Sequence, residues 1–310
     1  MTIQKYKRRS FLQLAGLGTL FSMFHTKSSL GQVRSEAQQS DEPQFKLAMA
    51  SYTLREFKLD DTLAMTKRLG LKYICFKDFH LPLNSTPEHI SEVVKKVKDA
   101  GLELYAGGVI YMRSENQVNQ AFDYAKAAGM KIIVGSPNHE FLPLVNKKVQ
   151  EYDIKVAIHN HGPGDQNYPT AESAYELVKD LDSRIGLCLD IGHTKRLGLD
   201  PSVSAEKFID RLIEVHIKDV TSADARGGPI EIGHGVIDIP KFLRTLIKIN
   251  YSGKVAFEYE KDGKDPMPGL AESVGYIRGA LAGIKPPRLN FQMQDSKDKV
   301  ITDYRRNVNY

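Results

Sequence analysis

The sequence predicts a single-domain α/β protein in which eight strand–helix units close into a (β/α)8 barrel, the TIM-barrel architecture. From Phe45 onward, a short apolar and β-branched run, a polar turn and a stretch with helical spacing recur eight times. Alternation of this kind favours a parallel sheet, and eight units favour its closure. Seven of the nine histidines also stand at the ends of the predicted strands. In a parallel barrel, those ends converge at the mouth where sites are built.

The predicted elements follow one another in regular order along the chain. The strands are expected at Lys46–Tyr52, Tyr73–Lys77, Leu102–Gly107, Lys131–Gly135, Lys155–His159, Gly186–Asp190, Ile213–Ile217 and Val255–Tyr259. Helices between them include Asp60–Leu69, Pro87–Ala100, Gln117–Ala128, Thr170–Leu181 and Ile239–Ile249. Several helices precede a glycine, which accepts the left-handed conformation that ends a helix. An open doubly wound sheet is the alternative, but no Gly-x-Gly-x-x-Gly phosphate loop follows the first strand.

The first 31 residues are expected to be a targeting segment outside the barrel. Residues 7–13 read Lys-Arg-Arg-Ser-Phe-Leu-Gln, which resembles a twin-arginine export signal. The apolar stretch at residues 12–24 is too short to span a bilayer. Small residues at Ser29 and Gly31 permit cleavage, so we expect an exported, periplasmic protein without stable membrane insertion after cleavage. A cytoplasmic basic arm is the alternative.

The rest of the chain divides into a polar linker at 32–44, the barrel at 45–282 and a C-terminal tail at 283–310. The net charge of +5 arises within residues 1–31, which hold five basic residues and no acidic one. The remaining chain is therefore neutral and offers no basic face for nucleic acid or an anionic membrane. Cys75 and Cys188 lie in separate apolar runs, so buried free thiols are favoured over a disulfide.

Four consecutive strand ends carry side chains that can ligate a metal. They are His159, Asp190, His216 and Glu258, on the fifth to eighth predicted strands. Neighbouring strand ends converge on one side of a barrel mouth. Two imidazoles and two carboxylates suit a divalent ion such as Mn²⁺, Co²⁺, Zn²⁺, Fe²⁺ or Mg²⁺. A single strand-end histidine is more often bonded to the backbone, but four such residues together favour a metal site.

Four motifs surround these residues: Leu-Asp-Ile-Gly-His at 189–193, Val-His-Ile-Lys-Asp at 215–219, Gly-His-Gly-Val-Ile-Asp at 233–238 and Val-Ala-Phe-Glu at 255–258. In this order they resemble the xylose isomerase-like superfamily of divalent-metal sugar isomerases, epimerases and inosose-dehydratase-like enzymes. The likeness covers about Phe45 to Leu281. It implies that Asp190, His216 and Glu258 bind metal and that His193 contacts substrate, but it implies no particular sugar.

The fifth strand departs from the epimerase pattern. Ketose 3-epimerases of the superfamily place a glutamate there, which binds metal and exchanges a proton with one face of the substrate. This chain has His159 instead, which resembles some inosose-dehydratase-like relatives. A neutral imidazole can still ligate metal or act as a base near pH 7. Symmetric epimerisation by two carboxylates is therefore less strongly implied.

Further residues near the predicted strand ends are candidates for substrate contact. Those expected to bind substrate are Lys77, His80, His161, His193 and His234, while Tyr52, Arg55 and Tyr111 suit sugar hydroxyls and ring faces. Lys218 can stabilise an enediolate oxygen, or it can form an ion pair with Asp219. Glu260 is an alternative ligand to Glu258. His139 and Glu140 follow the fourth strand, and Glu140 is a possible source of the carboxylate missing from the fifth.

We therefore expect a metal-dependent sugar isomerase or epimerase that forms an enediolate on a polyhydroxylated ketone or aldehyde. Its catalytic residues would be Glu258, His159, His193 and Lys218. Loss of a β-substituent from the same intermediate would make it a dehydratase or lyase on a keto-sugar, inosose or 3-keto-glycoside. An endonuclease-IV-like phosphodiesterase needs a basic groove, and a non-catalytic sugar-binding barrel would not need this metal set. The expected partner is a small carbohydrate, and a homo-oligomer is compatible with the sequence.

Overall fold

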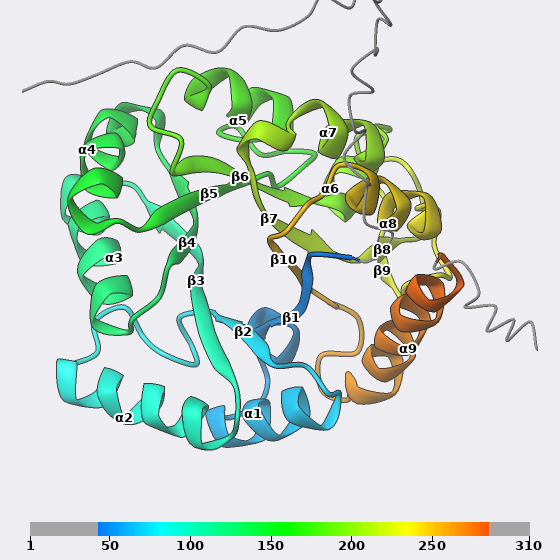
Figure 1. Cartoon of the computed structure of the whole chain (residues 1–310), viewed down its shortest axis with the longest axis horizontal. Helices are drawn as coiled ribbons and strands as arrows, with labels where there is room; N and C mark the ends of the chain where they lie inside the picture. The colour runs from blue at the N-terminus through cyan, green and yellow to red at the C-terminus, as the bar shows by residue number, and fades with distance from the viewer. Residues whose placement is uncertain (1–42, 285–310) are drawn as a thin grey trace, which may run out of the picture. The chain divides into compact units, whose positions relative to one another are not determined.

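The structure, a computed structural model, describes residues 43–284. Within this range, eight parallel strands form a closed barrel in the order β1-β10-β7-β6-β5-β4-β3-β2. Helices surround the strands in chain order (Figure 1). The predicted (β/α)8 barrel is therefore confirmed. The predicted export signal, nearly all of the linker and most of the C-terminal tail lie outside the described residues.

The barrel strands are β1 Lys46–Ala50, β2 Tyr73–Phe76, β3 Glu103–Met112, β4 Ile132–Pro137, β5 Lys155–His159, β6 Ile185–Asp190, β7 Leu212–Ile217 and β10 Lys254–Phe257. Two short strands, β8 Asp219–Val220 and β9 Pro229–Ile230, form an antiparallel pair after β7. β3 continues past its predicted end at Gly107, because Ile110–Met112 pairs with Gly135–Pro137 of β4 after a register shift. This extension carries Tyr111 to the barrel mouth.

The helices are α1 Leu59–Arg68, α2 Pro87–Asp99, α3 Glu115–Ala127, α4 Leu142–Tyr152, α5 Ala171–Val178, α6 Ile191–Lys195, α7 Pro201–Lys207, α8 Ile239–Lys248 and α9 Met267–Ile284. Three 3-10 turns, η1 Ser51–Leu54, η2 His139–Phe141 and η3 Ile209–Arg211, complete the order. Thr86, Ser114 and Thr170 cap α2, α3 and α5 with their hydroxyls, which supplies acceptors for otherwise unpaired amides. In the described range, no helix combines the length and apolar character needed to cross a membrane.

Two apolar clusters hold the barrel together. The larger one packs the strands against the helices, with Phe122 and Phe242 fully buried. The smaller one consists mainly of small residues, including Ala157, Cys188 and Ala256. Each of these three stands two positions before a predicted metal ligand, and alternate residues of a strand share a face. The barrel interior therefore has small side chains directly below three of the four predicted metal ligands, His159, Asp190 and Glu258.

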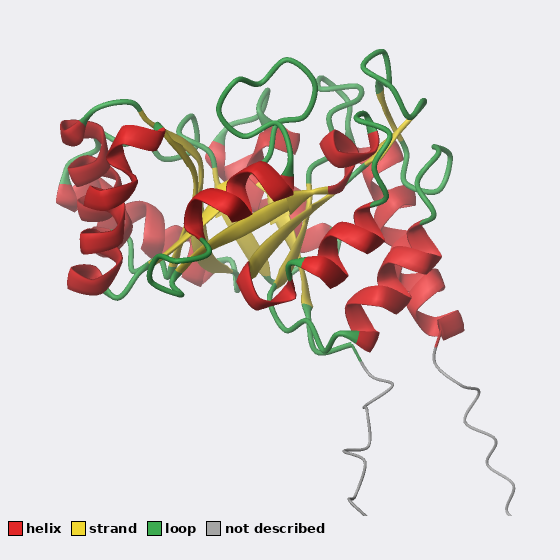
Figure 2. Ribbon diagram, turned by 90° about the horizontal axis from the view of Figure 1, so that it is seen from above, coloured by secondary structure: helices red, strands yellow, loops and turns green. Residues whose placement is uncertain are grey.

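Both cysteines, Cys75 and Cys188, are buried and free, as predicted. Figure 2 shows the strands enclosed by helices, with the longest loops on the side of the barrel away from the first and last described residues. The site residues lie on the longer-loop side, because they stand at the C-terminal ends of their strands.

Candidate active site

Strands β5, β6 and β7 and the residue after β10 bring four ionisable side chains together. One ligand atom from each of His159, Asp190, His216 and Glu258 lies within 4.8 Å of the others. Strand register accounts for this, because Asp190 pairs with His216 across β6 and β7. All four residues are buried. The structure thus assembles the residue set that the sequence singles out as metal ligands.

The donor atoms of this set fit a divalent metal. Both ring nitrogens of His159 and His216, and Oδ2 of Asp190, are buried and form no hydrogen bond within the described residues. Buried polar atoms normally have a partner. Asp190 Oδ2 has Lys218 Nζ 2.9 Å away, so it is the histidine nitrogens that need an explanation. Imidazole nitrogens and carboxylate oxygens are common donors to divalent transition metals. A bound divalent metal would satisfy one nitrogen of each imidazole together with Asp190 Oδ2.

Backbone and amide contacts orient Asp190. Its Oδ1 accepts a hydrogen bond from the backbone N–H of His193 at 2.8 Å, which caps α6. Asn160 Oδ1 accepts from the Asp190 backbone N–H at 2.9 Å, and the Thr194 hydroxyl donates to the Asp190 carbonyl at 2.7 Å. Oδ2 consequently faces the cluster, 3.3 Å from His159 Nε2. The sequence interpretation did not include Asn160, although its place between His159 and His161 is a signal for it.

Lys218 brings a positive charge into the same cluster. Its Nζ lies 2.9 Å from Asp190 Oδ2 and 2.6 Å from Glu258 Oε2, and it also contacts Glu260 Oε1. Gly192 makes room for the lysine stem, because a Cβ there would lie 2.5 Å from Lys218 Cγ. The glycine of the Leu-Asp-Ile-Gly-His motif therefore allows Lys218 to reach the carboxylates.

The alternative interpretation of Lys218, an ion pair with Asp219, is wrong. Asp219 instead accepts hydrogen bonds from the backbone amides of Gly233, Gly235 and Ile237, at 3.0, 3.1 and 3.2 Å. A Cβ on Gly235 would lie 2.2 Å from Asp219 Oδ1, so the glycine is needed for this close approach. The Gly-His-Gly motif thus folds a loop around a buried carboxylate.

The expectation that His234 contacts substrate is corrected by its position in this loop. Its ring points outward, and Nε2 lies 2.6 Å from Glu272 Oε1 on α9. More than half of the side chain is exposed, and it does not line the cavity that reaches the metal-ligand set.

Burial and charge set the protonation states of the two histidines. Burial lowers the pKa of His159 to about 4, so its ring is neutral at pH 7. Burial acts in the same direction on His216, but neighbouring carboxylates, with Glu258 contributing most, outweigh it and raise the pKa of His216. The ring of His216 lies close to Glu258, with Nδ1 3.3 Å from Oε2. The pKa of His159 is therefore lowered and that of His216 is raised, although both rings are buried in the same site.

The carboxylates remain ionised despite burial. Burial alone would raise the pKa of Asp190, but His193 and Lys218 hold it well below its usual value. For Glu258, Lys218 and then His216 likewise outweigh burial and lower the pKa. Asp190 and Glu258 are consequently negative at pH 7, which suits a cation-binding site.

A cavity of about 290 Å³ reaches this cluster. It is lined by Tyr52, Lys77, Val109, Tyr111, His159, His161, His193, Glu258 and Glu260. Tyr111 stacks on His161, with ring centroids 5.7 Å apart and 20° between the planes. The cavity lining therefore combines aromatic and ionisable side chains, which suits a small polar ligand with an apolar face. Of the predicted substrate contacts, Lys77, His161 and His193 line it.

His80 does not line the cavity, which corrects the expectation that it binds substrate. It is buried, with Nδ1 2.9 Å from Ser51 Oγ and Nε2 3.0 Å from Thr62 Oγ1. The backbone N–H of Lys77 also donates to Ser51 Oγ at 2.8 Å. His80 and Ser51 thus support the segment that carries Lys77. No sequence motif indicated that Ser51 would have this supporting role.

The structure also shows where two alternative carboxylate ligands and two further substrate-contact candidates lie. Glu140 is exposed and accepts a hydrogen bond from Asn138, so it does not replace the carboxylate missing from the fifth strand. Glu260 lines the cavity but contacts Lys218. His139 Nε2 lies 3.0 Å from the Asn167 carbonyl, outside the cavity lining. Arg55 lies over the Tyr52 ring and donates to the Glu260 carbonyl.

Comparison with known proteins places this barrel in a family. A sequence model of xylose isomerase-like TIM barrels matches residues 55–280. The chain belongs to this family. The rhizopine catabolism protein MocC of Rhizobium meliloti is similar to this chain, with 27% identity over 145 residues, which cover 42% of this chain and 44% of MocC. The inosose dehydratase of Clostridium tetani is 30% identical over 157 residues, covering 44% and 52%.

The chain thus spans about half the length of the curated relatives it matches. A solved structure of the IOLI protein with a bound zinc atom has a TM-score of 0.62 and 18% identity. The match covers 77% of this chain and 98% of that protein, and at this identity it shows the fold alone. The predicted membership of the xylose isomerase-like family is confirmed, and the known members of the family include epimerases, isomerases and dehydratases.

Proposed function

We propose that this protein is a metal-dependent dehydratase or lyase that acts on a polyhydroxylated ketone, such as a keto-sugar, inosose or 3-keto-glycoside. It would remove the proton beside the carbonyl and then expel a β-substituent. The observation that carries the proposal is the buried set of His159, Asp190, His216 and Glu258 at the end of a small cavity. The inosose dehydratases among the relatives support the ketone class.

His159, Asp190, His216 and Glu258 would hold the metal, whose identity among Mn²⁺, Fe²⁺, Co²⁺, Zn²⁺ and Mg²⁺ is left open by this donor set. When bound, the metal supplies Lewis-acid stabilisation of the charge that develops on the carbonyl oxygen. Lys218 adds a fixed positive charge beside the same carboxylates. Because it is buried, its field on a developing enediolate oxygen is weakly screened.

Glu258 at the end of the cavity can take the substrate proton, because it is ionised and a carboxylate has a second oxygen when one binds metal. His159 is neutral at pH 7, since burial lowers its pKa to about 4, so its one free lone pair can serve the metal or the proton, but not both at once. Elimination also needs an acid for the departing oxygen. His193 lines the cavity, and its Nδ1 lies 3.5 Å from Arg196 Nη1. Because the guanidinium can only donate, the ring proton of neutral His193 belongs on Nε2, where it can be given to a leaving hydroxyl.

Isomerisation or epimerisation is the second candidate. His159 Nε2 lies 4.0 Å from Glu258 Oε2, so two proton-exchanging groups flank the end of the cavity. Elimination is preferred because the cavity wall formed by β5 presents imidazoles, and its described lining includes no carboxylate from that strand. For epimerisation, the group on the β5 side that returns a proton to the opposite face of the substrate would have to be an imidazole.

The two candidates are separated by incubating metal-loaded protein with inososes, 3-keto-glycosides and free ketoses in D₂O. Elimination should give metal-dependent exchange of the hydrogen beside the carbonyl, followed by an enone and release of water or an alcohol. NMR and mass spectrometry measure both. A product of unchanged mass apart from deuterium would favour epimerisation or isomerisation. Absence of exchange with every substrate, while metal is bound, would refute proton removal by this site.

A further inference from the structure

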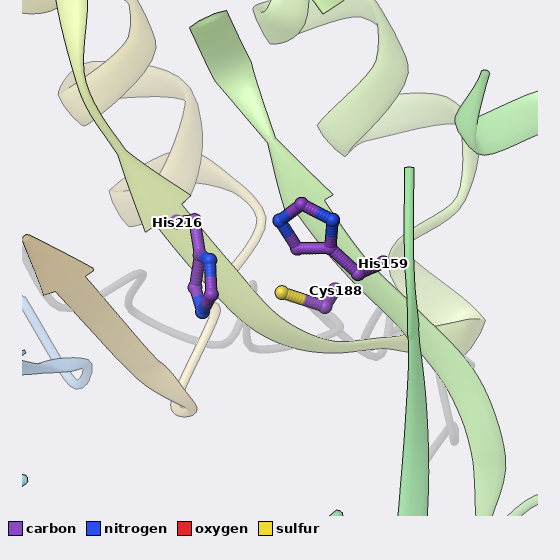
Figure 3. Close-up of side chains that lie close together, drawn as sticks. All are labelled: His159, Cys188 and His216. Carbon is purple, nitrogen blue, oxygen red and sulfur yellow. The ribbon is translucent and has the colours of Figure 1, made fainter. Parts of the chain in front are cut away.

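A thiol lies directly beneath the carboxylate-containing set. Cys188 precedes Asp190 by two residues on β6, so both side chains face the barrel interior and Cys188 lies one step deeper. Its Sγ and one ring nitrogen from each of His159 and His216 lie within 4.8 Å of one another. Figure 3 shows the sulfur directed between the two imidazole rings, whose centroids are 4.9 Å apart.

The two imidazoles that face this thiol lie near Asp190 and Glu258, but their ring nitrogens form no hydrogen bond in the described part of the chain. All four ring nitrogens of His159 and His216 are buried without a hydrogen bond, and Cys188 is fully buried and free. Cys75 is equally buried on β2, but it does not belong to a cluster of metal-ligating groups among these residues. Its Sγ lies 4.0 Å from the Gly108 carbonyl. Position, and not burial alone, therefore distinguishes Cys188.

We propose that His159, Cys188 and His216 form a second metal site that takes thiophilic cations such as Cd²⁺, Zn²⁺ or Cu⁺. Thiolate selects softer ions than carboxylate does, and three protein ligands with one open position suffice for zinc. On binding, the Cys188 S–H bond breaks, a sulfur–metal bond forms and the proton passes to solvent. The cavity reaches His159, which gives an ion a route to this depth.

The two sets of metal ligands share both imidazoles. The upper set is His159, Asp190, His216 and Glu258, and the deep set is His159, Cys188 and His216. An ion held with Cys188 therefore excludes an ion held with Asp190 and Glu258, and thiophilic cations should displace Mn²⁺ from the protein. The deep set differs from the upper one in its chemistry, because it offers a thiolate and no carboxylate. It does not depend on which reaction the upper set supports.

Metal-stripped protein titrated with Co²⁺ and Cd²⁺ tests the proposal by absorption spectroscopy. Wild type and the matched control Cys75→Ser should show sulfur-to-metal charge-transfer absorption, whereas Cys188→Ser should show none. In Cys188→Ser the affinity for Cd²⁺ should fall about tenfold or more, while the affinity for Mn²⁺ should change by less than about twofold. Cys188→Ala provides the same comparison if serine impairs folding.

Asp190→Asn separates this proposal from the proposed function. It should lose Mn²⁺ while retaining the sulfur-to-metal absorption, because only the upper set is damaged. Two results would overturn the deep site: no charge-transfer absorption in wild type, which needs no variant, or undiminished absorption in folded Cys188→Ser. Loss of the absorption in folded Asp190→Asn would refute a site made without carboxylates.

Discussion

The ammonium of Lys218 lies 2.6 Å from the carboxylate of Glu258, and both side chains are buried. Burial alone would lower the pKa of Lys218, but Asp190 and then Glu258 outweigh it and raise that pKa well above its ordinary value. The lysine is therefore charged throughout the physiological range. Any cation bound by Glu258 uses the same carboxylate group, so lysine and metal share its negative charge.

The first prediction is that Lys218→Met lowers the free energy of unfolding of metal-stripped protein by about 3 kcal/mol, because buried carboxylates lose their counter-charge. Excess Mn²⁺ should restore part of the loss. Urea denaturation with and without metal measures both effects. The control, Lys241→Met, removes an exposed pair with Asp200 and should cost less than about 1 kcal/mol. Equal losses in the two variants would contradict this account.

The second prediction concerns metal content. Purified protein should hold about one divalent transition metal per chain, and Asp190→Ala and His216→Ala should each abolish its binding at the upper set. These side chains stand at adjacent strand ends, with buried donor atoms that form no hydrogen bond within the described residues. Elemental analysis after dialysis gives the stoichiometry, with Mn²⁺ supplied as the probe. His234→Ala is the control and should retain the metal, since His234 lies outside the set. Retention of Mn²⁺ in both site variants would remove this assignment.

The repeat of apolar runs was enough to predict the barrel, because strand and helix periodicities and strand-end positions are local properties of the sequence. Strand order then places the side chains at 159, 190, 216 and 258 side by side. The direction of a loop side chain, by contrast, depends on contacts with distant segments and cannot be predicted from the neighbouring sequence. His80 and His234 follow strands, yet one is held by Ser51 and Thr62 and the other by Glu272.

Contacts between distant segments explain the remaining differences. Lys218 reaches Asp190 and Glu258 only because Gly192, in the first turn of α6, has no side chain. Asn160 holds Asp190 across thirty positions of sequence, and no periodicity indicates such a pair. Residues in the chemically obvious motifs were therefore easier to find than those that orient them.

The third prediction uses Glu214, which lies in the barrel interior with Oε1 2.5 Å from the Tyr105 hydroxyl. Burial raises its pKa from 4.5 to about 8, so the folded protein retains a proton that the unfolded chain releases. Stability from this group is therefore lost as pH rises toward 8. Between pH 6.5 and 8, wild type should lose about 2 kcal/mol relative to Glu214→Gln.

Urea denaturation at the two pH values measures this difference. His159 is present in both proteins, so its opposite contribution to the pH dependence cancels in the comparison with Glu214→Gln. Glu206→Gln, at an exposed glutamate, should follow wild type. A pH-independent difference between wild type and Glu214→Gln would show that Glu214 is ionised at pH 6.5.

The fourth prediction concerns residues outside the described range. We propose that residues 1–31 direct export through the twin-arginine pathway, on the basis of Arg8 and Arg9 before an apolar stretch. Replacing both arginines by lysine keeps the charge but removes the paired guanidinium groups. Folded protein should then remain in the cytoplasm while wild type appears in the periplasm. Equal distribution in cell fractions would identify the segment as a basic arm.

The last prediction addresses proton exchange at the fifth strand. Elimination needs the substrate proton to be taken once, whereas epimerisation needs a group that returns a proton to the opposite face. His159→Glu would place a carboxylate at this position that can ligate metal and exchange a proton. The ratio of epimerised to eliminated product should therefore rise by about tenfold or more. His159→Gln is the matched control, because it offers an oxygen donor but no group to carry the proton. NMR in D₂O measures deuterium at the inverted carbon beside the yield of enone. An unchanged ratio in metal-loaded His159→Glu would mean that this position does not govern the fate of the enediolate.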